Sequence, residues 1–214
     1  PFQKDIELHL SRPVKIANDA NCLALSEIKD GAAIGCQVVF AVILGTGVGG
    51  GIVVNNEVMS GINGIAGEWG HNSLPWPTSE EHPGPHCYCG KNGCIETFLS
   101  GPGLSADHFR KNNEQLDAHV IEKNAASGNK LSHDTLVRFE ERLAKALARV
   151  MNILDPQVIV LGGGLSKIER LYTNLPKLFH QYVFSQKIRT KLVAAKHGDS
   201  SGVRGAAMLW STQR

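Results

Sequence analysis

Three of the five cysteines of this 214-residue chain lie within eight positions of one another. Cys87, Cys89 and Cys94 belong to the stretch HCYCGKNGCIE, in which two glycines can adopt the positive φ that a tight turn requires. Zinc prefers four Cys and His ligands in tetrahedral geometry, and short cysteine spacings let one turn supply several of them. The spacing therefore predicts a zinc site in this stretch.

The fourth ligand of this site is left open by spacing, because His71, His82 and His86 are all candidates. Four protein ligands leave no position for a reacting water, so we expect a structural metal. Ordinary loop thiols are one alternative, and a redox pair is a weaker one because CxC is an unusual redox spacing. Cys22 and Cys36 stand alone in apolar patterns and are expected to be buried thiols.

Three acidic residues could do chemistry near the predicted metal. Glu68 in GEWGH and Glu96 in GCIE flank the cysteines in sequence. Asp19 in NDAN follows a short apolar run, residues 14–17, that reads as a strand, so it is a candidate general base at the carboxyl edge of a sheet. Alternatively, Asp19 caps the helix that follows.

Two glycine-rich stretches could approach an anion with their backbone amides. LGTGVGGG, residues 44–51, is flanked by apolar strands, and Thr46 adds a hydroxyl donor. VLGGGLS, residues 160–166, ends a predicted strand and opens toward a helix. Taken alone, such a glycine-rich stretch could equally be a β-turn without a ligand. Two such stretches in one chain favour a nucleotide site. Neither matches GxxxxGK[ST], so a P-loop is not supported.

The elements that would position these residues alternate between strand and helix. A helix follows NDAN and closes on Gly31 or Gly35, and β-branched runs on both sides of the first glycine stretch read as a hairpin of core strands. Residues 62–93 read as a long loop. A long amphipathic helix runs from about Ser132, its expected N-cap, to Asp155. The alternation predicts an α/β fold.

Composition excludes several classes of protein. The apolar content is 42%, the charged content is 20% and the net charge is +2. There is no apolar run of about 20 residues, so no membrane partner is expected. Basic residues are not clustered, so no nucleic-acid partner is expected either. PFQKDIELHL does not read as a signal peptide, and the cysteines suit a reducing compartment, so we expect a cytoplasmic protein.

NDAN, LGTGVGGG, GEWGH, CYCGKNGCIE and VLGGG, in this order, resemble the ROK family of sugar kinases and sugar-responsive repressors. The stretches around GEWGHNSLPW and CYCGKNGCIETFLSG look most like the bacterial fructokinase and mannokinase branch. The resemblance implies an actin-like ATPase (ribonuclease H-like) fold of two lobes with a cleft between them. It also implies that His71, Cys87, Cys89 and Cys94 hold a structural zinc ion.

By the same resemblance, Asp19 is the catalytic base that accepts the proton of the sugar hydroxyl. The residues implied to contact sugar hydroxyls are Asn18, Asp19, Glu68, His71 and Glu96. The residues implied to contact ATP, which would be accompanied by magnesium, are Gly45, Thr46, Gly47 and Gly49 near the phosphates and Gly162, Gly163 and Gly164 near the adenosine.

The expected reaction is ATP-dependent phosphorylation of a hexose, most simply fructose to fructose 6-phosphate, with mannose, glucose and N-acetylglucosamine as the next candidates. A homodimer is expected from the resemblance. One alternative is a sugar-responsive ROK repressor whose DNA-binding helix-turn-helix precedes these residues. Another is a zinc-stabilised module without small-molecule function, which leaves the second glycine stretch unexplained.

The resemblance also predicts how the chain is divided. Family kinases begin with a strand and a DxGGT loop, which these residues do not contain. Residues 1–17 are therefore expected to be the end of the first lobe and a linker strand, and residues 18–197 the C-terminal lobe. Residues 198–214 are expected to form a final helix that returns toward the first lobe. Without the DxGGT loop, we expect this chain to be inactive alone.

Overall fold

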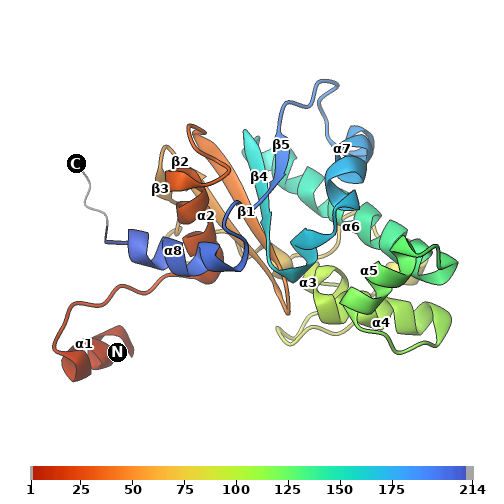
Figure 1. The fold of residues 1–214 in the computed structure, drawn as a ribbon, viewed down its shortest axis with the longest axis horizontal. Coiled ribbons are helices and arrows are strands. Elements are labelled where there is room, and N and C mark those ends of the chain that lie inside the picture. Colours follow the sequence, from red (N-terminus) through yellow and green to blue (C-terminus); the bar gives the residue numbers. More distant parts are fainter. Residues whose placement is uncertain (1, 211–214) are drawn as a thin grey trace.

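A five-stranded mixed sheet with helices on both faces is the centre of the computed structural model, which describes residues 2–210 (Figure 1). The strand order is β3-β2-β1-β4-β5. Strand β1 pairs parallel with β4 and antiparallel with β2, β4 pairs parallel with β5, and β2 pairs antiparallel with β3. The predicted α/β fold is confirmed.

Eight α-helices and five strands in the described part of the chain make up this architecture. The strands are β1 (Val38–Leu44), β2 (Val48–Val54), β3 (Glu57–Val58), β4 (Val158–Gly162) and β5 (Lys191–Ala194). The helices are α1 (Phe2–Leu10), α2 (Asp19–Asp30), α3 (Glu96–Leu99), α4 (Gly101–Asn112), α5 (Ala118–Ala126), α6 (Lys130–Leu154), α7 (Arg170–Tyr182) and α8 (Ser201–Met208). None of the helices within residues 2–210 has the length and hydrophobicity to cross a membrane.

The central strands are apolar along their whole length because both faces of the sheet are covered. Phe40 and Val42 of β1 belong to the core on the α6 side, whereas Val39 and Ala41 belong to the core on the α2 side. Side chains alternate between the faces of a strand, so a strand buried on both sides reads as a continuous apolar run.

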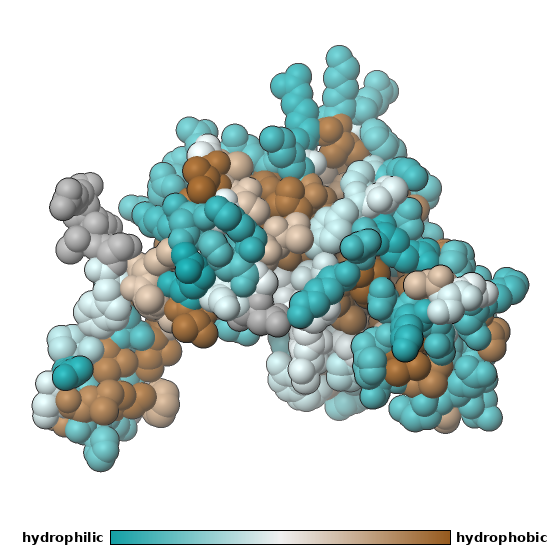
Figure 2. Space-filling view, viewed as in Figure 1, coloured by the Kyte–Doolittle hydropathy of each residue, from teal (hydrophilic) through white to brown (hydrophobic). Residues whose placement is uncertain are grey.

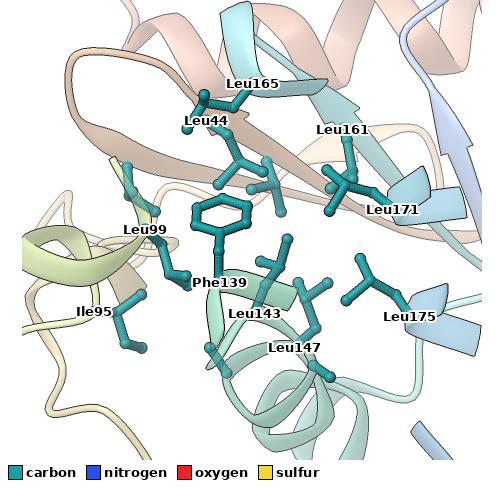
Figure 3. Packing of buried hydrophobic residues seen from close by; sticks show 14 of the residues in the cluster. Leu44, Ile95, Leu99, Phe139, Leu143, Leu147, Leu161, Leu165, Leu171 and Leu175 are labelled. Atoms are coloured by element: carbon teal, nitrogen blue, oxygen red, sulfur yellow. The ribbon is translucent and has the colours of Figure 1, made fainter. Parts of the chain in front are cut away.

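The larger core lies between the sheet and the long helix α6. Phe139, Leu143 and Leu147 repeat at four-residue spacing along α6, and all three are buried. They point toward Leu161 of β4 and Leu171 of α7 (Figure 3). This apolar stripe is what the sequence pattern of the helix predicts.

The other face of the sheet is covered by α2, and α8 packs closely against α2. A Cβ atom at Gly51 of β2 would collide with the carbonyl of Ala20, and one at Gly205 of α8 would collide with the carbonyl of Cys22. Glycine at Gly51 and Gly205 therefore lets β2 and α8 approach the backbone of α2.

A buried carboxylate joins α2 to the C-terminal part of the chain. Glu27 is fully buried and accepts hydrogen bonds from the Ser201 hydroxyl at 2.9 Å and from the amides of Ala32 at 2.7 Å and Lys196 at 3.1 Å. A buried charge needs such partners to offset its loss of hydration. The start of α8 is thereby fixed beside α2.

The predicted strand at residues 14–17 is wrong. Residues 13–18 have no regular structure, and they connect α2 to α1, a helix that the sequence analysis did not predict. An apolar tetrapeptide becomes a strand only when another strand lies beside it. Helix α1 stands apart from the sheet (Figure 1). The surface of this helix carries exposed apolar side chains (Figure 2), and Phe2 and Leu8 are among the exposed apolar residues.

Two other local predictions are corrected by the structure. The N-cap of α6 is Asn129 rather than Ser132, because the Asn129 side chain accepts the Ser132 amide at 2.9 Å. In LGTGVGGG only residues 45–47 form the turn, since Gly49 and the two glycines after it lie within β2. Helix α6 ends at Asp155 as predicted, and α2 ends at the first of its two candidate glycines. Residues 211–214 of the predicted final segment lie outside the described residues.

Candidate functional site

The candidate general base is the first residue of α2. Asn18 is the N-cap of this helix, and its Oδ1 accepts the amide of Ala20 at 2.8 Å. Asp19 Oδ1 accepts the same amide at 2.8 Å, and the Asp19 side chain is exposed. A Cβ at Gly49 would lie 4.0 Å from Asp19 Oδ1, so strand β2 passes directly beside the carboxylate. Since Asn18 takes the N-cap position, capping does not account for Asp19.

Glu96 joins the start of α3 to the hairpin turn. Its Oε2 accepts the amide of Val48 at 2.9 Å, and a Cβ at Gly47 would lie only 2.7 Å from the same oxygen. Glycine is therefore needed at Gly47 for the turn to approach this carboxylate. The β1-β2 hairpin thus lies between Asp19 and Glu96.

Glu68 and His71 are brought to the same hairpin by a short 3-10 helix, η1 (Trp69–His71). The indole Nε1 of Trp69 donates to the carbonyl of Gly49 at 3.0 Å, and a Cβ at Gly70 would collide with the carbonyl of Val48. Glu68 is exposed at the N-cap of η1 and His71 is half-buried at its end. The packing of η1 against β2 fixes both side chains relative to the hairpin.

The metal cluster consists of His71, Cys87, Cys89 and Cys94, whose ligand atoms all lie within 4.8 Å of one another. His71 Nδ1 is 3.5 Å from Cys87 Sγ, and the sulfurs of Cys89 and Cys94 are 3.6 Å apart. Tetrahedral zinc with bonds of about 2.3 Å places its sulfur ligands about 3.8 Å apart, whereas a disulfide is about 2 Å long. The residues therefore fit a closed zinc site, and His71 is the histidine that the structure brings to it.

The turn that carries the cysteines also shifts the pKa values of two of them. The backbone amide of Lys91 is the main reason that the pKa of Cys89 is lowered to about 7, while burial raises the pKa of Cys94 to about 12. Gly90 and Gly93 have φ of 86° and 70°, which the predicted tight turn required. Because zinc binds thiolates, metal binding at this cluster would release the protons of its thiols.

Tyr88 is a neighbour of these residues that the sequence analysis overlooked. Its hydroxyl lies 2.9 Å from His71 Nε2, and the two rings meet edge to face with centroids 5.0 Å apart. The pKa of Tyr88 is raised, first by the charge of Glu96, then by burial, and also by Glu68. Its closest polar contact is with His71, and the sequence offers no signal for it beyond the place of Tyr88 between two cysteines.

A pocket of about 520 Å³ is shared by the two glycine stretches. Gly45 and Thr46 of the first stretch and Gly164 of the second line it, although more than a hundred residues separate them in sequence. The other residues that line the pocket come from α4, α5 and the segment after β4: Gly101, Pro102, Ala118, His119, Glu122, Leu165, Lys167 and Ile168. Apart from Leu165, which belongs to the second glycine stretch, these residues carry no local motif, so the sequence analysis did not find them.

The remaining glycines assigned to the nucleotide lie outside the residues that line this pocket. Gly47 and Gly49 lie on the side of Glu96 and Asp19, as described above. Gly162 packs against Leu23, and Gly163, with φ of 83°, lies against the backbone of Leu44. Gly162 and Gly163 therefore allow close packing of β4 against its neighbours.

The hairpin turn, residues 45–47, is the element that connects the two halves of this arrangement. One end of the turn lines the pocket, and its other end contacts Glu96. The carbonyl of Gly45 also accepts the amide of Gly101 at 2.8 Å, which ties α4 to the turn. A ligand in the pocket and a ligand beside Asp19 would thus meet across a few residues of backbone.

Comparison with known proteins agrees with this geometry. The profile of the ROK family matches residues 1–213. The chain belongs to the ROK family. An N-acetyl-D-glucosamine kinase from Photobacterium profundum is 45% identical over 212 residues, which are 97% of this chain and 70% of the relative. The relatives of this chain thus include ROK sugar kinases.

Solved ROK structures share the fold. A ROK glucokinase from Streptomyces griseus, solved with glucose and AMPPNP, superposes with a TM-score of 0.84 at 29% identity, covering 98% of this chain and 72% of that chain. A ROK transcriptional regulator, a homologue of the E. coli MLC protein, gives 0.83 at 25% identity, covering 97% of this chain and 54% of that chain. The fold is that of actin-like ATPases, as the motifs implied. The named curated relative acts on N-acetylglucosamine, so fructose receives no support from it.

Proposed function

We propose that this chain forms the sugar- and ATP-binding lobe of an ATP-dependent hexose kinase, with residues 18–197 as the lobe itself. The observation that supports the proposal most is the position of the turn at residues 45–47. It lines a pocket of nucleotide size at one end and contacts Glu96 at the other, with Asp19 beside the same hairpin. Phosphoryl transfer requires this juxtaposition of a phosphate cradle and an acceptor site.

In this proposal Asp19 is the general base. Its exposed carboxylate accepts the proton of the sugar hydroxyl while the hydroxyl oxygen forms a bond to the γ-phosphorus of ATP and the bond from that phosphorus to the ADP oxygen breaks. The N-terminus of α2 and the Ala20 amide keep Asp19 in place. Such a base contributes about 10²–10⁴-fold to the rate.

The sugar is bound by Asn18, Glu68, His71 and Glu96 through its hydroxyls. Carboxylates and imidazole nitrogens suit this role because they form charge-assisted or directional hydrogen bonds with hydroxyl groups. A zinc ion held by His71 and the three cysteines would serve as a structural cross-link. It would hold η1 and the start of α3 against the hairpin.

The nucleotide occupies the pocket between the glycine stretches. Gly45 and Thr46 would face its phosphates, which carry magnesium as part of the substrate, and Gly164 would lie toward the adenosine. Backbone amides in glycine turns bind phosphate oxygens well because a missing Cβ lets the anion come close.

N-acetylglucosamine is the sugar we propose. The 45% identity to a kinase that carries this name supports it over fructose, which the motifs alone had favoured. A site that hydrogen-bonds an amide can reject a sugar without one, because buried polar groups would then lose their partners.

The test is ATP-dependent phosphorylation by the full-length protein of N-acetylglucosamine, glucose, mannose and fructose, with Asp19→Asn measured beside it. We expect N-acetylglucosamine to give the highest kcat/KM. Asp19→Asn should lower kcat about 10²–10⁴-fold and leave the sugar Kd nearly unchanged. Asp134→Asn, which alters a partly exposed carboxylate of α6, is the matched control and should keep full activity. Full turnover in Asp19→Asn would remove Asp19 from the mechanism.

A sugar-responsive repressor is the second candidate, favoured by the TM-score of 0.83 to a ROK transcriptional regulator. A full-length protein that binds a hexose with normal affinity but transfers no phosphate would support this candidate. DNA binding that the same hexose modulates would then be the decisive measurement.

A further inference from the structure

Tyr88 is a sugar-site residue that the proposed function does not yet use. It stands between two of the zinc-ligand cysteines, and its side chain is 81% exposed. An exposed aromatic ring beside a polar cluster has little reason to be fixed in place. Here, however, its hydroxyl meets His71 Nε2 at 2.9 Å.

The chemistry of His71 makes this contact significant. Its Nδ1 faces the sulfur of Cys87 at 3.5 Å and is the atom placed to bind the metal. A neutral imidazole that binds metal through one nitrogen carries its proton on the other. Nε2 therefore offers one N–H, and the Tyr88 hydroxyl accepts it.

A sugar hydroxyl bound by His71 would need the same N–H. We infer that the Tyr88 hydroxyl competes with the hexose for His71 Nε2–H, so that sugar binding displaces the phenol and Tyr88 sets the affinity of the sugar site. The inference rests on the proposed function, in which His71 contacts the sugar. It assigns a role to a residue that neither the motifs nor the relatives single out.

The position of Tyr88 allows this displacement. The side chain lies at the surface, so rotation about its χ1 torsion can move the ring into solvent without moving either neighbouring cysteine. Its hydroxyl lies 2.9 Å from His71 Nε2, so the phenol occupies one of the proposed sugar contacts. A hexose that occupies those contacts would fill the space beside the ring.

The experiment is calorimetric titration of the full-length protein with N-acetylglucosamine, comparing wild type with Tyr88→Phe. The variant keeps the ring and loses the competing hydroxyl. We expect its Kd to fall about threefold to tenfold, the effect of one ordinary hydrogen bond. Zinc content should stay the same in both proteins. Tyr182→Phe, which removes a hydroxyl that donates to Glu141 on α6, is the matched control and should leave the Kd unchanged.

An unchanged or higher Kd in Tyr88→Phe would overturn the competition. If the wild-type protein binds no hexose, the proposed function and the inference both fail. If it binds the hexose but Tyr88→Phe does not lower the Kd, only the inference fails. A second measurement does not depend on the folding of Tyr88→Phe. Site-specific incorporation of 3-fluorotyrosine at position 88 places a single ¹⁹F label on this residue. The Tyr88 signal should shift when N-acetylglucosamine is added, and a static signal would overturn displacement.

Discussion

At the scale of single residues, glycines decide how closely the segments of the site approach one another, because a glycine has no side chain. The glycines of LGTGVGGG look alike in the sequence, yet they serve different purposes. Gly45 lines the pocket shared by the two glycine stretches, Gly47 admits the Glu96 carboxylate, and Gly51 admits the backbone of α2. The motif could be found from the sequence, but its division into turn and strand could not. That division depends on which segments pack against the hairpin.

Replacing Gly51 with alanine is expected to destabilise the protein. The new Cβ would collide with the carbonyl of Ala20, so α2 must shift or the strand must bend. Overpacking of this kind costs about 1–3 kcal/mol, which urea unfolding would measure as a lower free energy of unfolding. Gly202→Ala is the control, since no heavy atom outside its own helix lies within 4 Å of the new Cβ. Equal stability of the two variants would contradict the prediction.

At the scale of elements, the segment before the cysteines, which contains Thr78 and Glu81, is anchored by buried charges as well as by the metal cluster. Arg142 of α6 is 5% exposed and donates to Glu81 at 2.6 Å and to Asp107 of α4 at 2.9 Å. Burial alone would raise the pKa of Glu81, but hydrogen bonds from the Thr78 amide and from Arg142, together with its charge, outweigh burial and lower it. No local sequence pattern indicates this network, because its members are distant in the chain.

Arg142→Met tests this anchor through its pH dependence. Removing the guanidinium takes the ion-pair partner from Glu81, while Asp107 keeps Arg138 at 2.8 Å, so the free energy of unfolding at pH 7 should fall by about 3 kcal/mol. In wild type the folded pKa of Glu81 lies below its ordinary value of 4.5, so its stabilisation is complete above that pH and is lost as the pH falls. In the variant burial dominates and raises the pKa, so acid relieves the destabilisation.

The difference in unfolding free energy between wild type and Arg142→Met should therefore be largest at pH 7 and smaller near pH 4. Urea unfolding at both pH values measures it. Lys130→Met, which breaks an exposed pair with Asp134, serves as control and should change stability by less than about 1 kcal/mol. A difference that stays constant with pH would show that Glu81 is not the group involved.

At the scale of the whole molecule, the proposed sugar contacts and the proposed nucleotide pocket are built from different parts of the chain. The proposed sugar contacts depend on η1, the cysteine turn and the start of α3. The pocket depends on the hairpin turn, α4, α5 and the segment after β4. The two sites share residues 45–47 and little else, so the metal should support one more than the other.

Removal of the metal is expected to affect ligand binding at the two sites differently. Chelation frees His71 and the cysteine turn, so affinity for N-acetylglucosamine should be lost while affinity for an ATP analogue changes little. Calorimetry before chelation, after it and after zinc is returned would show both effects. Cys94→Ser should behave like the chelated protein, and Cys36→Ser, away from the cluster, should behave like wild type. Joint loss of both affinities would indicate global unfolding instead.

The sequence by itself determined what depends on nearby residues: the strand-helix alternation, the glycine turns, the spacing of the cysteines and the motifs of the ROK family. Short-range spacing fixes local geometry because only a few backbone conformations connect such residues. The tertiary structure confirmed His71, which spacing alone had left open and the resemblance had named, and it decided which residues line the pocket and where Tyr88 lies. These contacts form only when distant segments bury their apolar faces together, and local spacing carries no record of that packing.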